Sequence, residues 1–222
     1  MSARRVKGKT GRPVKVAGEK GTKEKIFEAA IEMFAERGYD GVSIRDIGRA
    51  VGISEAAVYR HYPGKEAILD SIFAFVEGRI YPQAPEESYD AIVDAVPFEE
   101  LLQSIPRYMI ADPQLIRITR IMMIEMYRNE KIREYVQREL FQRPVDETEA
   151  LFRRLMAKGK IRECDPGALA KVFIAYITYW YFETFIFDYG VPLDASHVEK
   201  TTRAQIKLFV ALTRPEGGVA HE

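Results

Sequence analysis

The sequence predicts an all-α protein in which a small N-terminal helical domain is joined to a larger helical C-terminal domain. Apolar residues recur at intervals of three and four along most of the 222-residue chain, as they do on one face of an α-helix. No stretch of any length alternates apolar and polar residues in the way that predicts a half-buried strand. Residues 42–65 combine two short helical patterns with a glycine between them and a Pro-Gly pair after them, which predicts a helix-turn-helix.

The charges of the chain balance overall but are unevenly distributed. There are 33 Lys/Arg and 33 Asp/Glu. Residues 1–25 hold nine basic and two acidic residues, a net charge of 9 − 2 = +7, so the remainder has 24 − 31 = −7. A basic arm on an acidic body indicates that one end of the protein meets a polyanion.

Several classes of protein are disfavoured by the composition. The single cysteine, Cys164, rules out an internal disulfide and is typical of a reducing compartment. Residues 1–21 do not resemble a secretion signal, and the uncharged apolar run 172–182 is shorter than the about 20 residues that span a bilayer. We therefore expect a cytoplasmic protein without a membrane partner.

The sequence also gives little support to an enzyme. The three histidines are far apart and lack metal-ligand spacing, and Cys164 with His197 has no third group nearby. Neither a GxSxG nucleophile motif nor a phosphate-binding loop is present. We expect no catalytic residue, no metal site and no cofactor.

Residues 1–21 are rich in Gly, Lys and Arg, and we expect a flexible arm that strengthens binding to nucleic acid through counterion release. The Gly-Arg-Pro around Arg12 resembles part of an AT-hook, in which the arginine enters a narrow A·T minor groove. The alternative is a solvated cationic tail without a defined groove. The first helix is expected from Thr22, as its N-cap, to about residue 37, with Gly38 after its end.

Individual residues of the helix-turn-helix suit the beginning, the crossing and the end of its two helices. Ser43 and Ser54 are suitable N-caps for its two helices. Gly48 allows the helices to cross closely, and Gly52 suits a turn that needs φ > 0. Pro63 ends the second helix, because proline has no N–H and disfavours helix in the preceding residue.

Beyond this motif, a helix over 65–80 should connect the two domains, and residues 81–88, with two prolines, should form a loop. Further helices are expected over 98–111, 113–128, 130–158, 166–188 and 195–212, with a possible bend at Pro106 and a kink or break at Pro144. The predicted organisation is a flexible arm at 1–21, a helix-turn-helix domain at 22–80, a helical ligand-binding and dimerisation domain at 81–213, and a flexible tail at 214–222.

Four stretches resemble the N-terminal domain of TetR-type transcriptional regulators. These are TKEKIFEAA at 22–30, FAERGYDGVSI at 34–44, IGRAVGIS at 47–54 and VYRHYPGKE at 58–66. The resemblance covers about residues 22–75 and rests on specific motifs, whereas the rest of the chain is similar only in length and helical character. It implies a homodimeric, ligand-responsive repressor whose divergent C-terminal domain binds the ligand.

The second helix of the motif is expected to expose a surface that enters the major groove of DNA. By resemblance, phosphates are contacted by Tyr59, His61 and Lys65, a guanine by Arg45, and a thymine methyl by Ala56 or Ala57. The alternatives are a half-buried phenol, a packing histidine and an arginine paired with a neighbouring carboxylate. The complete set of expected DNA-binding residues is Ser43, Ile44, Arg45, Ser54, Glu55, Ala56, Ala57, Tyr59, Arg60, His61, Lys65 and Arg12.

Methionine and aromatic residues are concentrated on three of the later helices, and such side chains line adaptable apolar pockets. Arg117, Arg120 and Glu125 could orient a ligand there. The alternative is an ordinary core, since an apolar stripe at helical spacing is more often that. The expected ligand-binding residues are Tyr108, Met109, Arg120, Met122, Met123, Met126, Tyr127, Tyr176 and Trp180.

Helix 168–187 is apolar on more than one face, so another surface must cover it. By resemblance, the last two long helices pair with their counterparts in a homodimer, which would place two recognition helices about 34 Å apart. We therefore predict a ligand-responsive regulator, a repressor released from a palindromic DNA operator by a small apolar or aromatic effector. The alternatives are a similar DNA binder controlled by a protein partner and a sequence-tolerant architectural DNA-binding protein.

Overall fold

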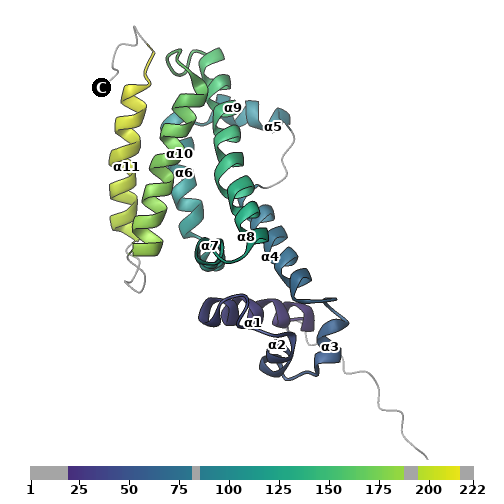
Figure 1. The fold of residues 1–222 in the computed structure, drawn as a ribbon. Coiled ribbons are helices and arrows are strands. Elements are labelled where there is room, and N and C mark those ends of the chain that lie inside the picture. The colour runs from purple at the N-terminus through teal and green to yellow at the C-terminus, as the bar shows by residue number, and fades with distance from the viewer. Residues whose placement is uncertain (1–19, 82–85, 188–194, 216–222) are drawn as a thin grey trace, which may run out of the picture.

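The computed structural model describes residues 20–81, 86–187 and 195–215, and within these ranges the chain forms helices and turns without a strand (Figure 1). The prediction of an all-α fold is confirmed. Arg12 and the expected arm and tail lie largely outside the described residues. The elements are α1 (Thr22–Arg37), α2 (Ile44–Val51), α3 (Glu55–Tyr59), α4 (Lys65–Ile80), α5 (Glu86–Ala95), α6 (Phe98–Ile110), α7 (Pro113–Glu125), α8 (Glu130–Tyr135), η1 (Val136–Gln142), α9 (Arg143–Ala157), α10 (Pro166–Phe182), η2 (Glu183–Phe187) and α11 (Ala195–Leu212).

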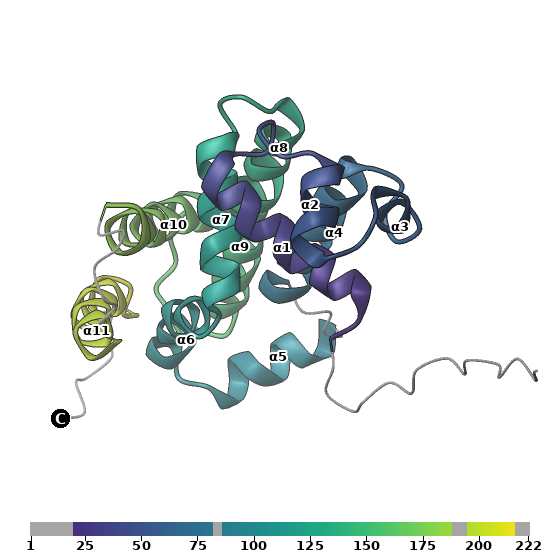
Figure 2. The same ribbon diagram turned by 90° about the horizontal axis from the view of Figure 1, so that it is seen from below.

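Helices α1, α2 and α3 form a small unit at one end of the molecule (Figures 1 and 2). Its core contains the completely buried side chains of Ile26, Ile47 and Val58. Gly38 ends α1 with φ of 74°, as expected for the residue after a helix. The start of α1 differs by one residue from the prediction: Gly21 is the N-cap and Thr22 is already helical.

Helix α4 leaves this unit and runs into the larger helical body (Figure 1). One face of it is apolar and buried, with the side chains of Ile68, Leu69, Ile72, Phe73 and Val76. It contacts both α1 and α7, so one rigid helix connects the two parts of the chain.

The larger body is built around α9 and α10, which pack along each other, and around α6 and α11, which form a second closely packed pair. Phe152 and Phe173 are completely buried and contact edge to face at 6.0 Å, and both lie against Phe209 of α11. The described helices include none that is long and apolar enough to cross a membrane.

One helix was missed by the sequence analysis. Residues 86–88 were assigned to a loop, but they form the first turn of α5. The two prolines that suggested a loop precede the helix in the sequence.

The expected disturbance near Pro144 is present, and its form is a change of helix type. Residues Val136–Gln142 are π-helical, and α9 continues from Arg143 without a loop. A proline inside an α-helix lacks one N–H and clashes with the carbonyl four residues earlier, and a π-helical turn moves that carbonyl away. A second π-helical turn, Glu183–Phe187, extends α10.

Candidate DNA-binding surface and ligand cavity

The two helices of the helix-turn-helix begin at serine caps, as predicted. The Ser43 hydroxyl accepts a hydrogen bond from the Asp46 N–H at 3.2 Å, and the Asp46 carboxylate accepts one from the Ser43 N–H at 3.1 Å. The Ser43 hydroxyl also donates to the Asp46 carboxylate, and this bond together with the one from the Ser43 N–H lowers the pKa of Asp46. At the second helix, the Ser54 hydroxyl accepts from the Ala57 N–H at 3.2 Å.

Glycine determines how closely the two helices approach. Gly52 has φ of 76° in the turn, a left-handed conformation that glycine adopts without strain. A Cβ on Gly48 would lie 3.0 Å from the Ile53 carbonyl oxygen and 3.2 Å from Val58 Cγ2. The crossing of α2 and α3 therefore depends on the missing side chain at Gly48.

Most of the predicted DNA-contacting side chains lie on an exposed surface. Tyr59 is 48% exposed, and Arg45 has no ion-pair partner among the described residues, because Asp46 pairs instead with Arg49 at 3.6 Å. The other exposed members of the predicted set are Ser43, Ser54, Glu55, Ala56, Arg60 and His61.

Three residues of the set are placed differently from the prediction. Ile44 and Ala57 are only 7% and 8% exposed and belong to the buried core. Lys65 is half-buried: its Nζ donates to the Tyr39 carbonyl at 2.8 Å and lies 4.2 Å from the Tyr39 ring centroid. It therefore stabilises the turn before α2. Burial raises the pKa of Tyr39 to about 12, so the ring stays neutral beneath the ammonium.

A cavity of about 930 Å³, partly open to solvent, lies in the larger body. Helices α4, α5, α6, α7, α9 and α10 and the π-helical turn η1 line it, with aliphatic, aromatic, hydroxyl and charged side chains. Three of the nine predicted ligand-binding residues are in the lining: Tyr108, Met109 and Met123.

The other six predicted residues do not line this cavity. Met122 and Trp180 are each 2% exposed and pack in the core, whereas Tyr127 is 85% exposed. Successive residues of a helix point about 100° apart, so a run such as 121–127 cannot all face one cavity. The remaining three absent from the lining are Arg120, Met126 and Tyr176.

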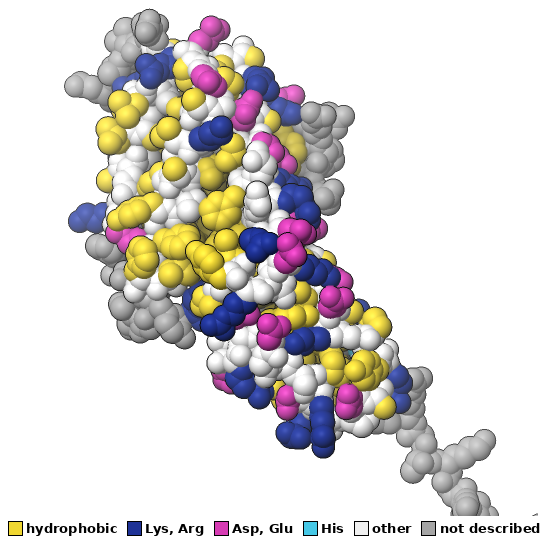
Figure 3. Space-filling view, viewed as in Figure 1, with side chains coloured by type: hydrophobic (Ala, Val, Ile, Leu, Met, Phe, Trp, Pro, Cys, Tyr) yellow, Lys and Arg dark blue, Asp and Glu magenta, His cyan; other side chains and the backbone are white. Residues whose placement is uncertain are grey.

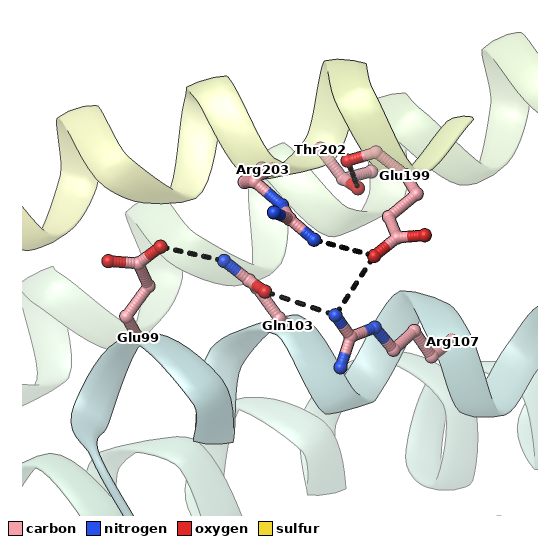
Figure 4. Close-up of polar contacts among 6 residues, drawn as sticks. All are labelled: Glu99, Gln103, Arg107, Glu199, Thr202 and Arg203. Carbon is pink, nitrogen blue, oxygen red and sulfur yellow. Dashed lines mark hydrogen bonds and ion pairs between the residues drawn. The ribbon is translucent and has the colours of Figure 1, made fainter. Parts of the chain in front are cut away.

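Polar groups that the sequence analysis did not single out lie in the cavity wall. The hydroxyls of Thr119 and Tyr181 share a buried hydrogen bond of 2.7 Å, and burial raises the pKa of the Tyr181 phenol. Arg107 also lines the cavity and reaches from α6 to Glu199 of α11 at 3.0 Å (Figure 4). Glu199 accepts from Arg203 as well, and these two arginines lower the pKa of its carboxyl group. The helices involved are distant in sequence, so no local pattern could have shown the grouping.

The two parts of the chain match two family models. Residues 26–72 match the model described as bacterial regulatory proteins, tetR family. Residues 100–213, just over half of the chain, match the model described as AefR-like transcriptional repressor, C-terminal domain. The chain belongs to the TetR family. It is therefore a DNA-binding transcriptional regulator and not an enzyme.

Individual relatives of this TetR-family regulator are distant over most of its length. The nucleoid occlusion factor SlmA of Aliivibrio fischeri is 27% identical over 142 residues, 64% of this chain and 69% of that protein. The negative transcriptional regulator IcaR of the biofilm operon icaADBC of Staphylococcus epidermidis is 48% identical over 46 residues, 21% of this chain and 25% of that protein. A TetR-family regulator of Mesorhizobium loti MAFF303099 has a similar fold, with a TM-score of 0.66 at 21% identity over 86% of this chain and 96% of that one.

Helix α7 of the TetR-family regulator connects the cavity with the helix-turn-helix domain. Leu115, Thr119 and Met123 follow one another at intervals of four residues and line the cavity. Ile118 and Met122 lie on another face and pack in the core that α1 and α4 share. Helix α7 therefore contacts both the cavity and α1 of the helix-turn-helix domain.

Proposed function

We propose that this TetR-family regulator is a homodimeric repressor, released from a palindromic operator by a small, largely apolar or aromatic effector bound in the cavity. The cavity itself carries this proposal. A volume of about 930 Å³ is within the range that holds small-molecule ligands, roughly 300–1,000 Å³. A solid, filled core would instead have favoured control by a protein partner.

The mechanism we propose is a population shift that acts on α4 and α7. Arg79 and Ile80, the last residues of α4, line the cavity together with residues of α7. Both helices also contact α1 of the helix-turn-helix domain. An effector that prefers a tilted arrangement of α4 would separate the recognition helices from successive major grooves. Almost complete release needs a preference of about 10⁴-fold for that arrangement.

On the DNA, α3 enters the major groove. Tyr59 and His61 contact phosphates, helped by the N-terminal N–H groups of the two capped helices. Arg45 donates two hydrogen bonds to a guanine edge, and Ala56 packs on a thymine methyl. The exposure of these four side chains supports the assignment.

Sequence-specific DNA binding is tested by selecting duplexes that bind the protein from a random library at physiological salt. We expect a palindrome with half-sites about ten base pairs apart. With the selected duplex, Tyr59→Ala should weaken binding to all sequences about equally, whereas Arg45→Ala should relax the preference at one position in each half-site. Arg49→Ala is the matched control, because it removes an exposed arginine from the same helix. If Arg45→Ala and Arg49→Ala behave alike, Arg45 does not read a base, and tight binding without any enrichment would favour the architectural alternative.

The homodimer is supported by the exposed apolar side chains of α10 and α11. Val172, Tyr179, Leu208 and Leu212 are each about three-fifths exposed. Hydrophobic side chains also gather over the upper body in the space-filling view (Figure 3). A two-fold partner would bury such a surface and place the two recognition helices for a palindrome.

The dimer surface is tested by sedimentation velocity. Leu208→Glu should convert a dimer to a monomer and weaken binding to the palindrome. Ile124→Glu is the control, because Ile124 is equally exposed but belongs to α7. Dimers that persist in Leu208→Glu would show that this face does not pair.

The effector site is tested by filling the cavity. Small molecules are extracted from the purified protein, identified by mass spectrometry and added to the complex with the selected duplex. Met123→Trp should block the release that they cause while leaving the operator affinity of the ligand-free protein within about twofold. An effector that leaves the operator affinity of the wild-type protein unchanged would refute the mechanism.

A further inference from the structure

The π-helical turn before Pro144 leaves one backbone carbonyl without a helical donor. In this turn, the Arg143 N–H donates to the Arg138 carbonyl, five residues earlier. The next acceptor in the same pattern is the carbonyl of Glu139, whose donor would be residue 144. Because Pro144 has no N–H, that bond cannot form. A half-buried carbonyl without a donor is costly, so another group must donate to it.

That donor comes from the end of α4. The Tyr81 hydroxyl donates to the Glu139 carbonyl at 2.6 Å. Tyr81 directly follows the last residue of α4 and is its C-cap. Burial raises the pKa of the Tyr81 phenol, so the hydroxyl keeps its proton and can donate.

The side chain of Arg143 holds the Tyr81 ring in this position. Its guanidinium lies 3.8 Å from the ring centroid and is itself fixed by Glu139 at 3.1 Å and Glu147 at 3.6 Å. Tyr81, Arg143, Pro144 and Glu147 all line the cavity. The bond between α4 and η1 is therefore within reach of a molecule in the cavity.

We propose that Tyr81 is a positioning residue for DNA binding. Its hydroxyl anchors the C-terminal end of α4 to the carbonyl that Pro144 leaves free, and this anchor sets the orientation of α4 that suits the operator. An occupant of the cavity that displaces Tyr81 from the Glu139 carbonyl releases α4. This inference rests on the proposed function only in its final consequence, the operator affinity; the anchor itself is a property of the ligand-free protein.

Three variants of the full-length, ligand-free protein isolate the anchor. Tyr81→Phe removes the hydroxyl alone. Pro144→Ala supplies an N–H and permits a regular α-helix, in which the Arg143 N–H donates to the Glu139 carbonyl four residues earlier and takes the acceptor from Tyr81. Tyr135→Phe is the matched control: the Tyr135 hydroxyl also joins α8 to α4, donating to the Phe73 carbonyl at 3.1 Å, but Tyr135 does not line the cavity.

The first measurement is hydrogen–deuterium exchange at the amides of residues 78–81. Tyr81→Phe and Pro144→Ala should each speed exchange there about fivefold. The loss of one ordinary hydrogen bond increases the equilibrium constant of a local opening by about that factor. The double variant should exchange no faster than either single variant, because both changes remove the same bond. Tyr135→Phe should leave these amides unchanged and speed exchange around residue 73.

The second measurement is the affinity for the selected duplex. Tyr81→Phe and Pro144→Ala should weaken it about three- to fivefold, and Tyr135→Phe by less than twofold. Pro144→Ala should lose affinity while its thermal midpoint stays equal to or above that of the wild type, because the substitution removes a proline from a helix. A variant with a damaged fold would instead have a lower midpoint.

The outcomes separate the two proposals. Unchanged exchange in Tyr81→Phe, or effects of Tyr81→Phe and Pro144→Ala that add, would overturn the anchor whatever the protein does on DNA. Faster exchange with unchanged operator affinity would overturn the positioning role. If the wild-type protein selects no operator, the proposed function fails, and the exchange experiment still decides whether Tyr81 anchors α4.

Discussion

Replacing Gly48 by alanine tests whether the glycine sets the crossing of α2 and α3. In the interior of a helix, Gly→Ala alone contributes about 1 kcal/mol of stability. At Gly48 the new Cβ would lie 3.0 Å from the Ile53 carbonyl oxygen, which belongs to the backbone of the turn and cannot rotate away, and 3.2 Å from Val58 Cγ2. Overpacking of this kind costs about 1–3 kcal/mol. We therefore expect a net loss of roughly 0–2 kcal/mol in the free energy of unfolding.

The control is Gly78→Ala, on the exposed side of α4. No atom lies within 4 Å of its added Cβ, so the helix preference is not opposed and we expect a gain of about 0.5–1 kcal/mol. Urea unfolding followed by circular dichroism measures both variants, and fluorescence anisotropy measures their affinity for the selected duplex. Gly48→Ala should also displace α3 and weaken that affinity about tenfold. Equal gains in stability for the two variants, with unchanged DNA binding, would refute the close crossing.

Two further predictions concern stability. Thr119→Val should lower the free energy of unfolding by about 1–3 kcal/mol in urea titrations, because the buried Tyr181 hydroxyl loses its partner at 2.7 Å; a loss below 0.5 kcal/mol would mean that another group replaces Thr119. Burial raises the pKa values of Tyr39 and Tyr176 to about 12 from an ordinary value near 10. As pH rises, the phenols therefore ionise first in the unfolded state. Each tyrosine should lower the free energy of unfolding by about 2 kcal/mol between pH 10 and 12, and should leave it unchanged below pH 10. Urea unfolding at a series of pH values checks this, and a flat profile from pH 9 to 12 would contradict it.

The helix-turn-helix could be predicted almost completely because its determinants are local. Ser43, Gly52 and Ser54 each act within four residues along the chain, through a cap or a left-handed turn. Ile44 and Ala57 were included among the DNA-binding residues because of their places in a family motif, but both side chains are buried. The hydrogen bond from the Lys65 ammonium to the Tyr39 carbonyl could not be predicted either, because its two partners are 26 residues apart in the chain.

The cavity could not be predicted in the same way, because its wall is assembled from helices that are far apart in sequence. Composition identified α6 and α7 correctly, and Tyr108, Met109 and Met123 do line the cavity. The same reasoning included Met122 and Trp180, which have equally suitable chemistry but point into the core. Only the packing of α7 against its neighbours, among them α1, α4 and α6, decides which of its faces meets the cavity, and the sequence of α7 alone does not determine that packing.

Pro144 shows how a local irregularity acquires a long-range consequence. From the sequence, proline predicts only that a helix is disturbed, and the structure takes up the disturbance as a π-helical turn without breaking the helix. The turn frees a carbonyl at residue 139, and a tyrosine 58 residues earlier donates to it. The proline thus provides an attachment point for the helix that carries the DNA-binding domain, in the wall of the cavity where an effector would lie. In a regular helix that carbonyl would accept a hydrogen bond from the helix's own backbone. The π-helical turn leaves it free to accept one from α4, so the irregular segment can connect the two parts of the protein.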